Sequence, residues 1–173
     1  ANMMKRLALI VAVACSFSGM AQQVTETKQG LRVDPAGDKP TTEVTVYAPN
    51  IIRVTKYADG LEALPAKKSY SVIMTPEKGK GLWSVEGNTL RTACLTVTVD
   101  AATGEVRFAD ADGNALLSER GAAEVISIAS GVDKGKFSIR QDFKLGADEA
   151  IYGLGQRRSP KLNQRGEKVE IWN

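Results

Sequence analysis

Hydrophobic and polar residues alternate in short runs through most of the chain. A period of two places the apolar side chains on one face of a β-strand. The clearest runs are 43–47, 51–55, 70–74, 82–86, 89–91, 95–99, 106–108, 115–117, 125–128, 137–139 and 169–171. Gly, Asp, Asn and Pro residues separate these runs at intervals typical of a sandwich or a barrel. No window after residue 22 keeps a 3.6-residue apolar period for three turns, so the pattern predicts an all-β fold.

Local signals refine this prediction. Gly87-Asn88 predicts a tight hairpin, and the segments 100–104 and 112–114 predict further turns. Gly153 and Gly155 predict a bulge or a close backbone approach inside a strand. We expect the side chains of Tyr152 and Leu154, which flank Gly153, to lie in the core.

The first residues have the pattern of a signal for export. Lys5 and Arg6 precede an uncharged apolar run at 7–15, and small residues follow at 19–21. The run is too short for a membrane-spanning helix. We therefore expect cleavage after Ala21. Lipid attachment at Cys15 is the alternative.

The composition is that of a globular domain, and it limits the chemistry. The 173 residues are 43% hydrophobic and 25% charged, and there is no histidine. A Ser-His-Asp or Cys-His nucleophile and a zinc site built on imidazole are therefore excluded within this sequence. The formal net charge of +3 falls to +1 once Lys5 and Arg6 leave with the leader. We expect no nucleic acid, no anionic membrane surface, no cofactor and no metal as partners.

Without the leader, Cys94 is the last thiol of the chain. It opens the alternating run 94–99, and no neighbouring residue marks it as a nucleophile. We interpret it as a buried structural cysteine.

The C-terminal part carries a set of closely spaced motifs. They are Phe-Lys-Leu at 143–145, Asp-Glu-Ala at 148–150, Ile-Tyr-Gly-Leu-Gly-Gln at 151–156, Leu-Asn-Gln-Arg-Gly at 162–166 and Ile-Trp-Asn at 171–173. Together they resemble the end of the N-terminal β-sandwich domain of glycoside hydrolase family 31, which contains α-glucosidases and α-xylosidases. The segments 51–54 and 95–117 resemble earlier strands and hairpins of that domain.

The N-terminal leader pattern and the resemblance together imply a domain organisation. Residues 1–21 are the signal peptide, with Ala1 and Asn2 interpreted as additions before Met3, and residues 22–40 are an extended N-terminal segment. Residues 41–173 are an antiparallel β-sandwich of the galactose-mutarotase-like supersandwich type. The catalytic (β/α)8 barrel with its two aspartates is absent from this chain and is expected to follow it, because the sequence stops inside an apolar alternating stretch.

The resemblance also implies candidate site residues. The loop after the Tyr-Gly-Leu-Gly element reaches the sugar pocket in the family, which assigns a pocket-lining role to Asn163, Arg165, Trp172 and Asn173. Amide and guanidinium groups form directional hydrogen bonds to sugar hydroxyls, and an indole face stacks on a pyranose ring. The alternative is that Asn163 and Arg165 are ordinary turn and solvent residues.

These observations predict a non-catalytic accessory domain of an exported, periplasmic or cell-surface, retaining α-glycosidase. Its expected partners are its own catalytic barrel and an α-linked oligosaccharide. A free-standing carbohydrate-binding module and a structural sandwich of a surface assembly are the alternatives. A reading frame that continues past Asn173 into a barrel would distinguish the first from the other two.

Overall fold

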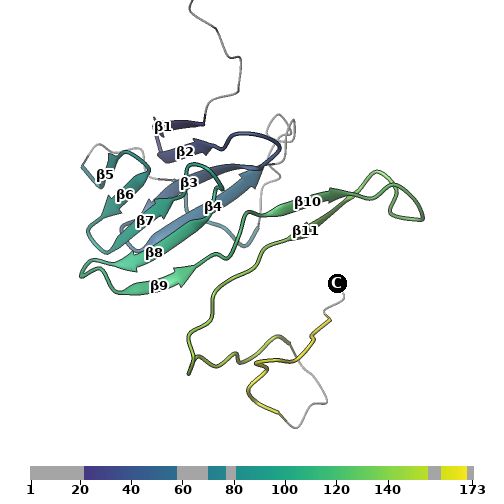
Figure 1. Cartoon of the computed structure of the whole chain (residues 1–173). Helices are drawn as coiled ribbons and strands as arrows, with labels where there is room; N and C mark the ends of the chain where they lie inside the picture. Colours follow the sequence, from purple (N-terminus) through teal and green to yellow (C-terminus); the bar gives the residue numbers. More distant parts are fainter. Residues whose placement is uncertain (1–21, 58–69, 77–80, 156–160, 171–173) are drawn as a thin grey trace, which may run out of the picture.

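The computed structural model describes residues 22–57, 70–76, 81–155 and 161–170, and every regular element within them is a β-strand (Figure 1). The expected signal peptide lies outside the described residues. The strands are β1 Gln23–Thr27, β2 Gly30–Asp34, β3 Thr41–Ala48, β4 Ile51–Tyr57, β5 Trp83–Glu86, β6 Thr89–Thr92, β7 Leu95–Val99, β8 Val106–Asp110, β9 Ala115–Ser118, β10 Glu124–Ser127 and β11 Phe137–Arg140. The prediction of an all-β fold is confirmed.

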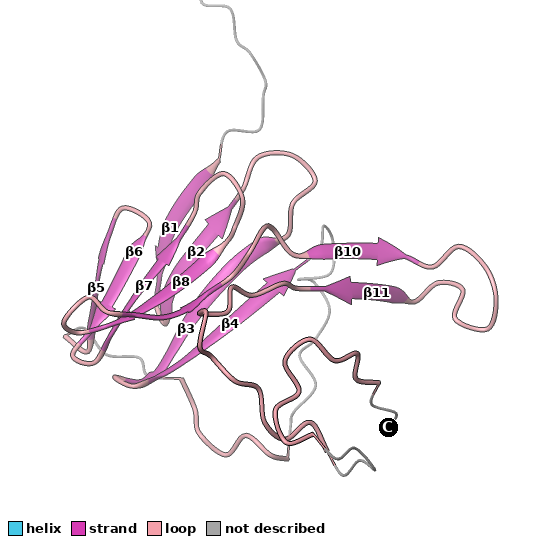
Figure 2. Ribbon diagram, turned by 60° about the horizontal axis from the view of Figure 1, so that its bottom comes forward, coloured by secondary structure: helices cyan, strands magenta, loops and turns pink. Residues whose placement is uncertain are grey.

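The strands form two main antiparallel sheets and one separate hairpin. One sheet has the order β1-β2-β3-β4, the second β5-β6-β7-β8-β9, and β10 pairs with β11. Neighbours in each sheet are also neighbours in sequence, so the sheets are built from hairpins. The two main sheets pack as a β-sandwich, and the β10–β11 hairpin projects beside it (Figures 1 and 2).

The core lies between the two main sheets. Its fully buried members come from both of them: Leu31, Val33, Val44, Val46, Leu90, Val97, Val99 and Val106. The alternating pattern explains the selection, because every second residue of β3 and β7 points inward. Each such side chain stabilises the fold by about 1.5–3 kcal/mol relative to its exposed state.

Polar contacts also join the two sheets. Lys56 on β4 donates from Nζ to Glu119 Oε2 and to the Gly104 carbonyl, each at 2.7 Å. Thr42 Oγ1 donates to the same carbonyl at 3.1 Å. Glu119 Oε2 also accepts the Val106 amide at 2.7 Å, so this nearly buried carboxylate has both a cation and an amide as partners.

Most predicted hairpins and turns are confirmed. Gly87 and Asn88 connect β5 to β6, and the turn 100–104 connects β7 to β8. Asp100 Oδ1 accepts the amides of Ala102 and Thr103 at 2.9 Å, which fixes that second turn. The turn at 112–114 lies between β8 and β9.

Two predicted strands are wrong or only partly described. Residues 70–76 form no strand, and Tyr70 and Ile73 are 96% and 92% exposed. Val169 also lies outside any strand, and residue 171 is outside the described residues. An alternating run becomes a strand only where another strand accepts its backbone hydrogen bonds, and no described strand pairs with these runs.

The segment 22–40, expected to be extended, contains the strands β1 and β2. β2 pairs with β3 and contributes Leu31 and Val33 to the core. The sandwich of this structure therefore includes residues that precede position 41.

Cys94 is exposed, which corrects the expectation of a buried thiol. It lies in the two-residue connection between β6 and β7, where its amide donates to Thr92 Oγ1 at 3.2 Å. The alternating pattern begins one residue later, at Leu95, so the period does not place Cys94 in the core.

Candidate functional site

Two of the predicted site residues, Asn163 and Arg165, belong to a C-terminal segment whose described parts contact each other and contain no strand. We call residues 146–151 together with 161–167 the C-terminal bracket. Its two parts are joined by backbone, since the Gln164 amide donates to the Ile151 carbonyl at 2.7 Å. Asn163 Oδ1 accepts the amides of Ile151 at 3.1 Å and of Arg165 at 3.0 Å. Asn163 therefore fixes the relative position of the two parts.

Arg165 makes the second connection within the C-terminal bracket. Its Nη1 donates to the carbonyl oxygens of Gly146 at 2.7 Å and of Glu149 at 2.6 Å. Glu149 in turn accepts the Gly146 amide at 2.9 Å through Oε2. The guanidinium thus closes the turn at 146–149, which the sequence pattern alone did not reveal.

Gln164 is a member of this site that sequence reasoning missed. It is only 6% exposed, and its Nε2 donates to the carbonyl of Lys161. The only sequence signal was its position between Asn163 and Arg165. A buried amide that is hydrogen-bonded to backbone favours one conformation of a loop over the alternatives.

The segment between the two parts of the C-terminal bracket departs from the prediction. Gly153, Leu154 and Gly155 have φ values of +89°, +64° and +86° and form a bend, so no strand passes here. A Cβ on either glycine would meet nothing within 4 Å, which excludes a close backbone approach among the described residues. Tyr152 and Leu154 are 69% and 41% exposed, so neither is a core residue of the described structure. A left-handed leucine is strained and therefore indicates a constrained loop.

The structure thus brings Asn163 and Arg165 together in one unit. Asn163 accepts hydrogen bonds from backbone amides, and Arg165 donates hydrogen bonds to backbone carbonyls. Asn163 Nδ2 has no hydrogen-bond partner among the described residues. Trp172 and Asn173 lie outside the described residues. The pocket-lining role of all four residues remains a prediction.

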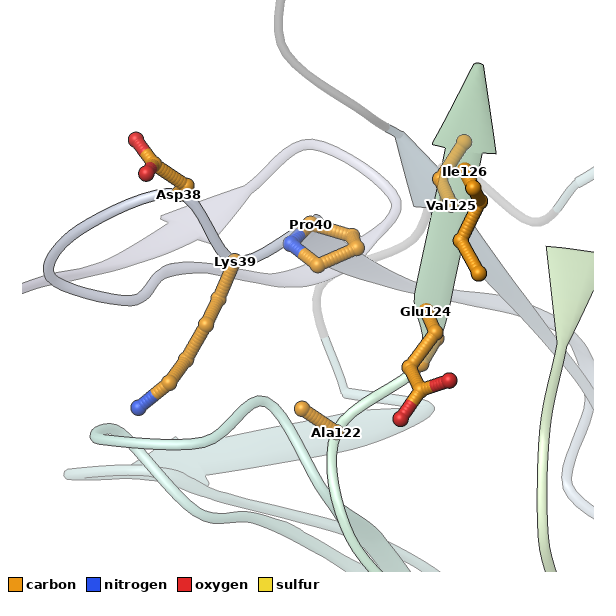
Figure 3. Close-up of a pocket in the computed structure, with 8 residues that line it drawn as sticks. Asp38, Lys39, Pro40, Ala122, Glu124, Val125 and Ile126 are labelled. Carbon is orange, nitrogen blue, oxygen red and sulfur yellow. The ribbon is translucent and has the colours of Figure 1, made fainter. Parts of the chain in front are cut away.

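One cavity of about 400 Å³ lies between the loop before β3 and the start of β10 (Figure 3). Its lining residues are Asp38, Lys39, Pro40, Ala122, Ala123, Glu124, Val125 and Ile126. Lys39 Nζ donates to the Ala102 carbonyl at 2.7 Å, and the carboxylates of Asp38 and Glu124 do not converge (Figure 3). This lining has no aromatic ring for a sugar to stack on.

A second cavity, of about 470 Å³, opens between the two main sheets and the β10–β11 hairpin. Its lining is mostly apolar and consists of Ile52, Val54, Lys56, Phe108, Leu117, Glu119, Ala123, Ile139, Gln141 and Phe143. The Lys56–Glu119 ion pair is the charged part of this lining.

A third, smaller cavity of about 200 Å³ lies beside an ion pair on the projecting hairpin. Arg140 Nη2 lies 2.7 Å from Asp142 Oδ2. The hydrogen bond from Arg140 lowers the pKa of Asp142, so this carboxylate remains ionised and is a poor proton donor.

The described ranges contain no group of three or more acidic or cysteine side chains placed to hold a metal ion. Nor do they include a helix long and apolar enough to cross a membrane.

Comparison with known proteins identifies the class of this fold. Residues 41–173 match the family model described as the glycosyl hydrolase 31 N-terminal galactose mutarotase-like domain. The chain belongs to this family, and the resemblance seen in its C-terminal motifs is confirmed.

A solved structure gives a particular relative. The chain is similar to the crystal structure of the GH31 α-xylosidase from Xanthomonas citri, with a TM-score of 0.68 and 30% sequence identity. The match covers 84% of this chain and 16% of that chain. The protein described here is thus an N-terminal domain of a family 31 enzyme and spans about a sixth of that relative.

Proposed function

We propose that this chain is the accessory domain of an exported, retaining α-glycosidase whose first substrate class is α-xylosides. The observation that carries the proposal is the match to the Xanthomonas α-xylosidase over 84% of this chain. α-Glucosides are the second substrate class, because the family that the C-terminal motifs resemble contains both activities.

In this proposal the reacting carboxyl groups belong to the barrel that follows the sandwich. Retention needs two such groups about 5–5.5 Å apart, one as nucleophile and one as acid and base. The sandwich would serve catalysis by holding a loop at the mouth of the barrel, where placement of the sugar relative to the nucleophile affects the rate.

Asn163 is the residue of the C-terminal bracket best suited to meet the sugar. Its Oδ1 is engaged by two amides, which fixes the side chain, while Nδ2 has no partner among the described residues and can donate to a hydroxyl. Arg165 acts as a positioning residue, because its Nη1 holds the turn at 146–149. The aromatic and amide side chains of Trp172 and Asn173 would complete this edge of the pocket.

The first test uses the polypeptide expressed from its gene to the natural stop codon. We expect hydrolysis of p-nitrophenyl α-xyloside with a kcat/KM at least tenfold above that for the α-glucoside, and NMR should show the α-anomer as first product. A higher kcat/KM for the α-glucoside would refute the preference for xylose. Absence of both activities would refute the glycosidase assignment.

The second test separates the donor of Asn163 from its structural role. Asn163→Asp keeps the Oδ1 acceptor for the two backbone amides and removes the Nδ2 donor. We expect KM to rise by up to about tenfold, the effect of one hydrogen bond, with chymotryptic cleavage after Tyr152 unchanged. Asn163→Ala should change both readouts. An unchanged KM for Asn163→Asp would refute the pocket role.

Export is tested by the mature N-terminus. Mass spectrometry should show that the secreted protein begins at Gln22. Detection of a lipid-modified Cys15 would instead support the alternative processing.

A further inference from the structure

The strand β4 has one edge that is unpaired in the described ranges. It is the last strand of its sheet and pairs with β3 along one side. Its seven residues, Ile51–Tyr57, are rich in β-branched side chains and contain no proline. A long edge of this kind associates with other strands unless it is covered.

The register identifies which backbone groups face this edge. The Val46 amide donates to the Gln29 carbonyl at 2.8 Å, so Val46 directs its backbone groups toward β2 and away from β4. Val46 opposes Ile52, which makes this a pair without mutual hydrogen bonds. Ile52, and with it the alternate residues Val54 and Lys56, must direct amide and carbonyl groups to the free edge.

The same residues line one wall of the second cavity. Ile52, Val54 and Lys56 place their side chains in the 470 Å³ space between β4 and the β10–β11 side of the molecule. Across it lie Ile139 and Phe143, which are 73% and 48% exposed. The cavity therefore has apolar walls on both sides.

A buried polar atom also lacks a partner at this cavity. Gln141 lines it, and its Oε1 is inaccessible to solvent with no hydrogen-bond partner in the described part of the chain. Such an atom costs free energy unless a donor reaches it. A donor in the cavity would reach this oxygen only after the Gln141 side chain turns, so the atom is compatible with an occupant of the cavity but does not require one.

We propose that a β-strand from the polypeptide following residue 173 pairs with the free edge of β4 and fills this cavity with apolar side chains. The inference rests on the proposed function, in which the chain is the first part of a longer enzyme. Backbone hydrogen bonds to Ile52, Val54 and Lys56 would provide the affinity, and the cavity would select the side chains.

Two observations and one general argument favour this occupant over a second copy. This chain covers only 16% of the α-xylosidase chain, so such an enzyme has ample polypeptide outside the domain. Residues 161–170 lie on the side of the molecule that carries β11, away from β5 (Figures 1 and 2). A segment of the same molecule also binds at a high effective concentration, without a second molecule.

The first experiment is residue-resolved amide hydrogen exchange on the full-length enzyme. Arg53 and Thr55 serve as internal controls because their amides already pair with β3. We expect protection factors for Ile52, Val54 and Lys56 within about thirtyfold of these controls, as for bonds in one cooperative sheet. Protection that is lower by more than this factor would show an open edge and overturn the proposal.

The second experiment identifies the occupant. A benzoylphenylalanine replaces Arg53, whose side chain is exposed beside the edge, and the full-length enzyme is photo-cross-linked. The expected cross-link is intramolecular, to a peptide beyond residue 173. A cross-link to a second copy, recognised by mixing isotope-labelled and unlabelled protein, or to residues before 174 would overturn the proposal.

The two proposals can fail separately. An enzyme that hydrolyses α-glycosides but has an open β4 edge would refute only the strand addition. A protected edge in a polypeptide without glycosidase activity would refute only the proposed function.

Discussion

The region before β9 and the region from β9 onward differ in where their hydrophobic residues are buried. All fully buried members of the core cluster lie between Leu31 and Val106. After residue 115, many large apolar side chains are exposed: Leu116, Leu117, Ile126, Val132, Phe137, Ile139, Phe143, Leu145, Tyr152, Leu154 and Leu162. The first region holds the whole of this buried cluster, although it also exposes Val24, Ile51, Tyr70, Val72, Ile73, Met74 and Leu82. The second region adds no member to the cluster and presents a surface suited to an interface.

The largest expected effect comes from a glycine of the first region. A Cβ on Gly30 would lie 2.1 Å from the Val44 carbonyl oxygen, and its φ is +151°. We expect Gly30→Ala to lower the free energy of unfolding by more than about 4 kcal/mol, since backbone cannot move aside in a core strand.

Its matched control is Gly131→Ala in the second region. Gly131 has a φ of +81° with nothing within 4 Å, so only strain of about 1–2 kcal/mol is expected. Urea unfolding measures both variants. Equal losses would contradict the contrast between the two regions.

Two truncations to alanine, one in each region, test the same contrast through packing. Leu90 is fully buried, whereas Ile126 is 56% exposed. Leu90→Ala should cost about 3 kcal/mol, and Ile126→Ala should change stability by less than about 0.5 kcal/mol. Thermal unfolding of both variants provides the comparison, and a loss at Ile126 as large as that at Leu90 would place it in a core.

The ion pair where the two regions meet should have an intermediate effect. Glu119→Gln leaves Lys56, whose side chain is 14% exposed, without its counter-charge. We expect a loss of about 2 kcal/mol. The double variant with Lys56→Met should recover part of it, because no unpaired charge remains. Strictly additive losses in this double-mutant cycle would show that the two side chains do not interact.

The smallest expected effect concerns pH. Asp34 accepts hydrogen bonds from Arg32 Nη2 at 2.8 Å and from Thr41 Oγ1 at 2.7 Å. The bond from Arg32 is the main reason why the pKa of Asp34 is lowered in the folded chain. The resulting stability is present above the ordinary aspartate pKa of about 4 and is lost as the pH falls through the lower folded value.

Asp34→Asn should therefore cost less than about 1 kcal/mol at pH 7 and reduce the acid dependence of unfolding. Asp142→Asn is the counterpart in the second region, where Arg140 likewise lowers the pKa of a partly exposed carboxylate. Acid titrations of unfolding that coincide with the wild type for Asp34→Asn would contradict the prediction.

The sequence predicted those features that depend on neighbours in the chain. Alternation located β3, β7 and β8, and Gly87-Asn88 located a hairpin, because period and turn chemistry are local. The strand predicted at 70–74 is wrong, because a strand also needs a partner edge that no local pattern specifies. The prediction that Tyr152 lies in the core is wrong for a related reason, because burial depends on residues distant in the sequence.

The site shows the same division. The motifs at 151–156 and 162–166 pointed to a segment in which Asn163 and Arg165 belong to one hydrogen-bonded unit, while their role in a sugar pocket stays a prediction. Their engagement with the backbone of residues 146–151 could not be predicted, because it joins positions 12 to 19 residues apart through a bend with left-handed φ values. Gln164 was missed because nothing in its sequence context indicates burial.

The hydrogen bonds of Asn163, Gln164 and Arg165 to residues 146–151 have a practical consequence for enzyme engineering. These contacts between the described parts of the loop join residues within 146–167, so we expect the segment to be transferable as one unit. Chimeras with junctions before Gly146 and after Glu167 would move the loop whole between homologues, whereas a junction at 155 would separate its two halves.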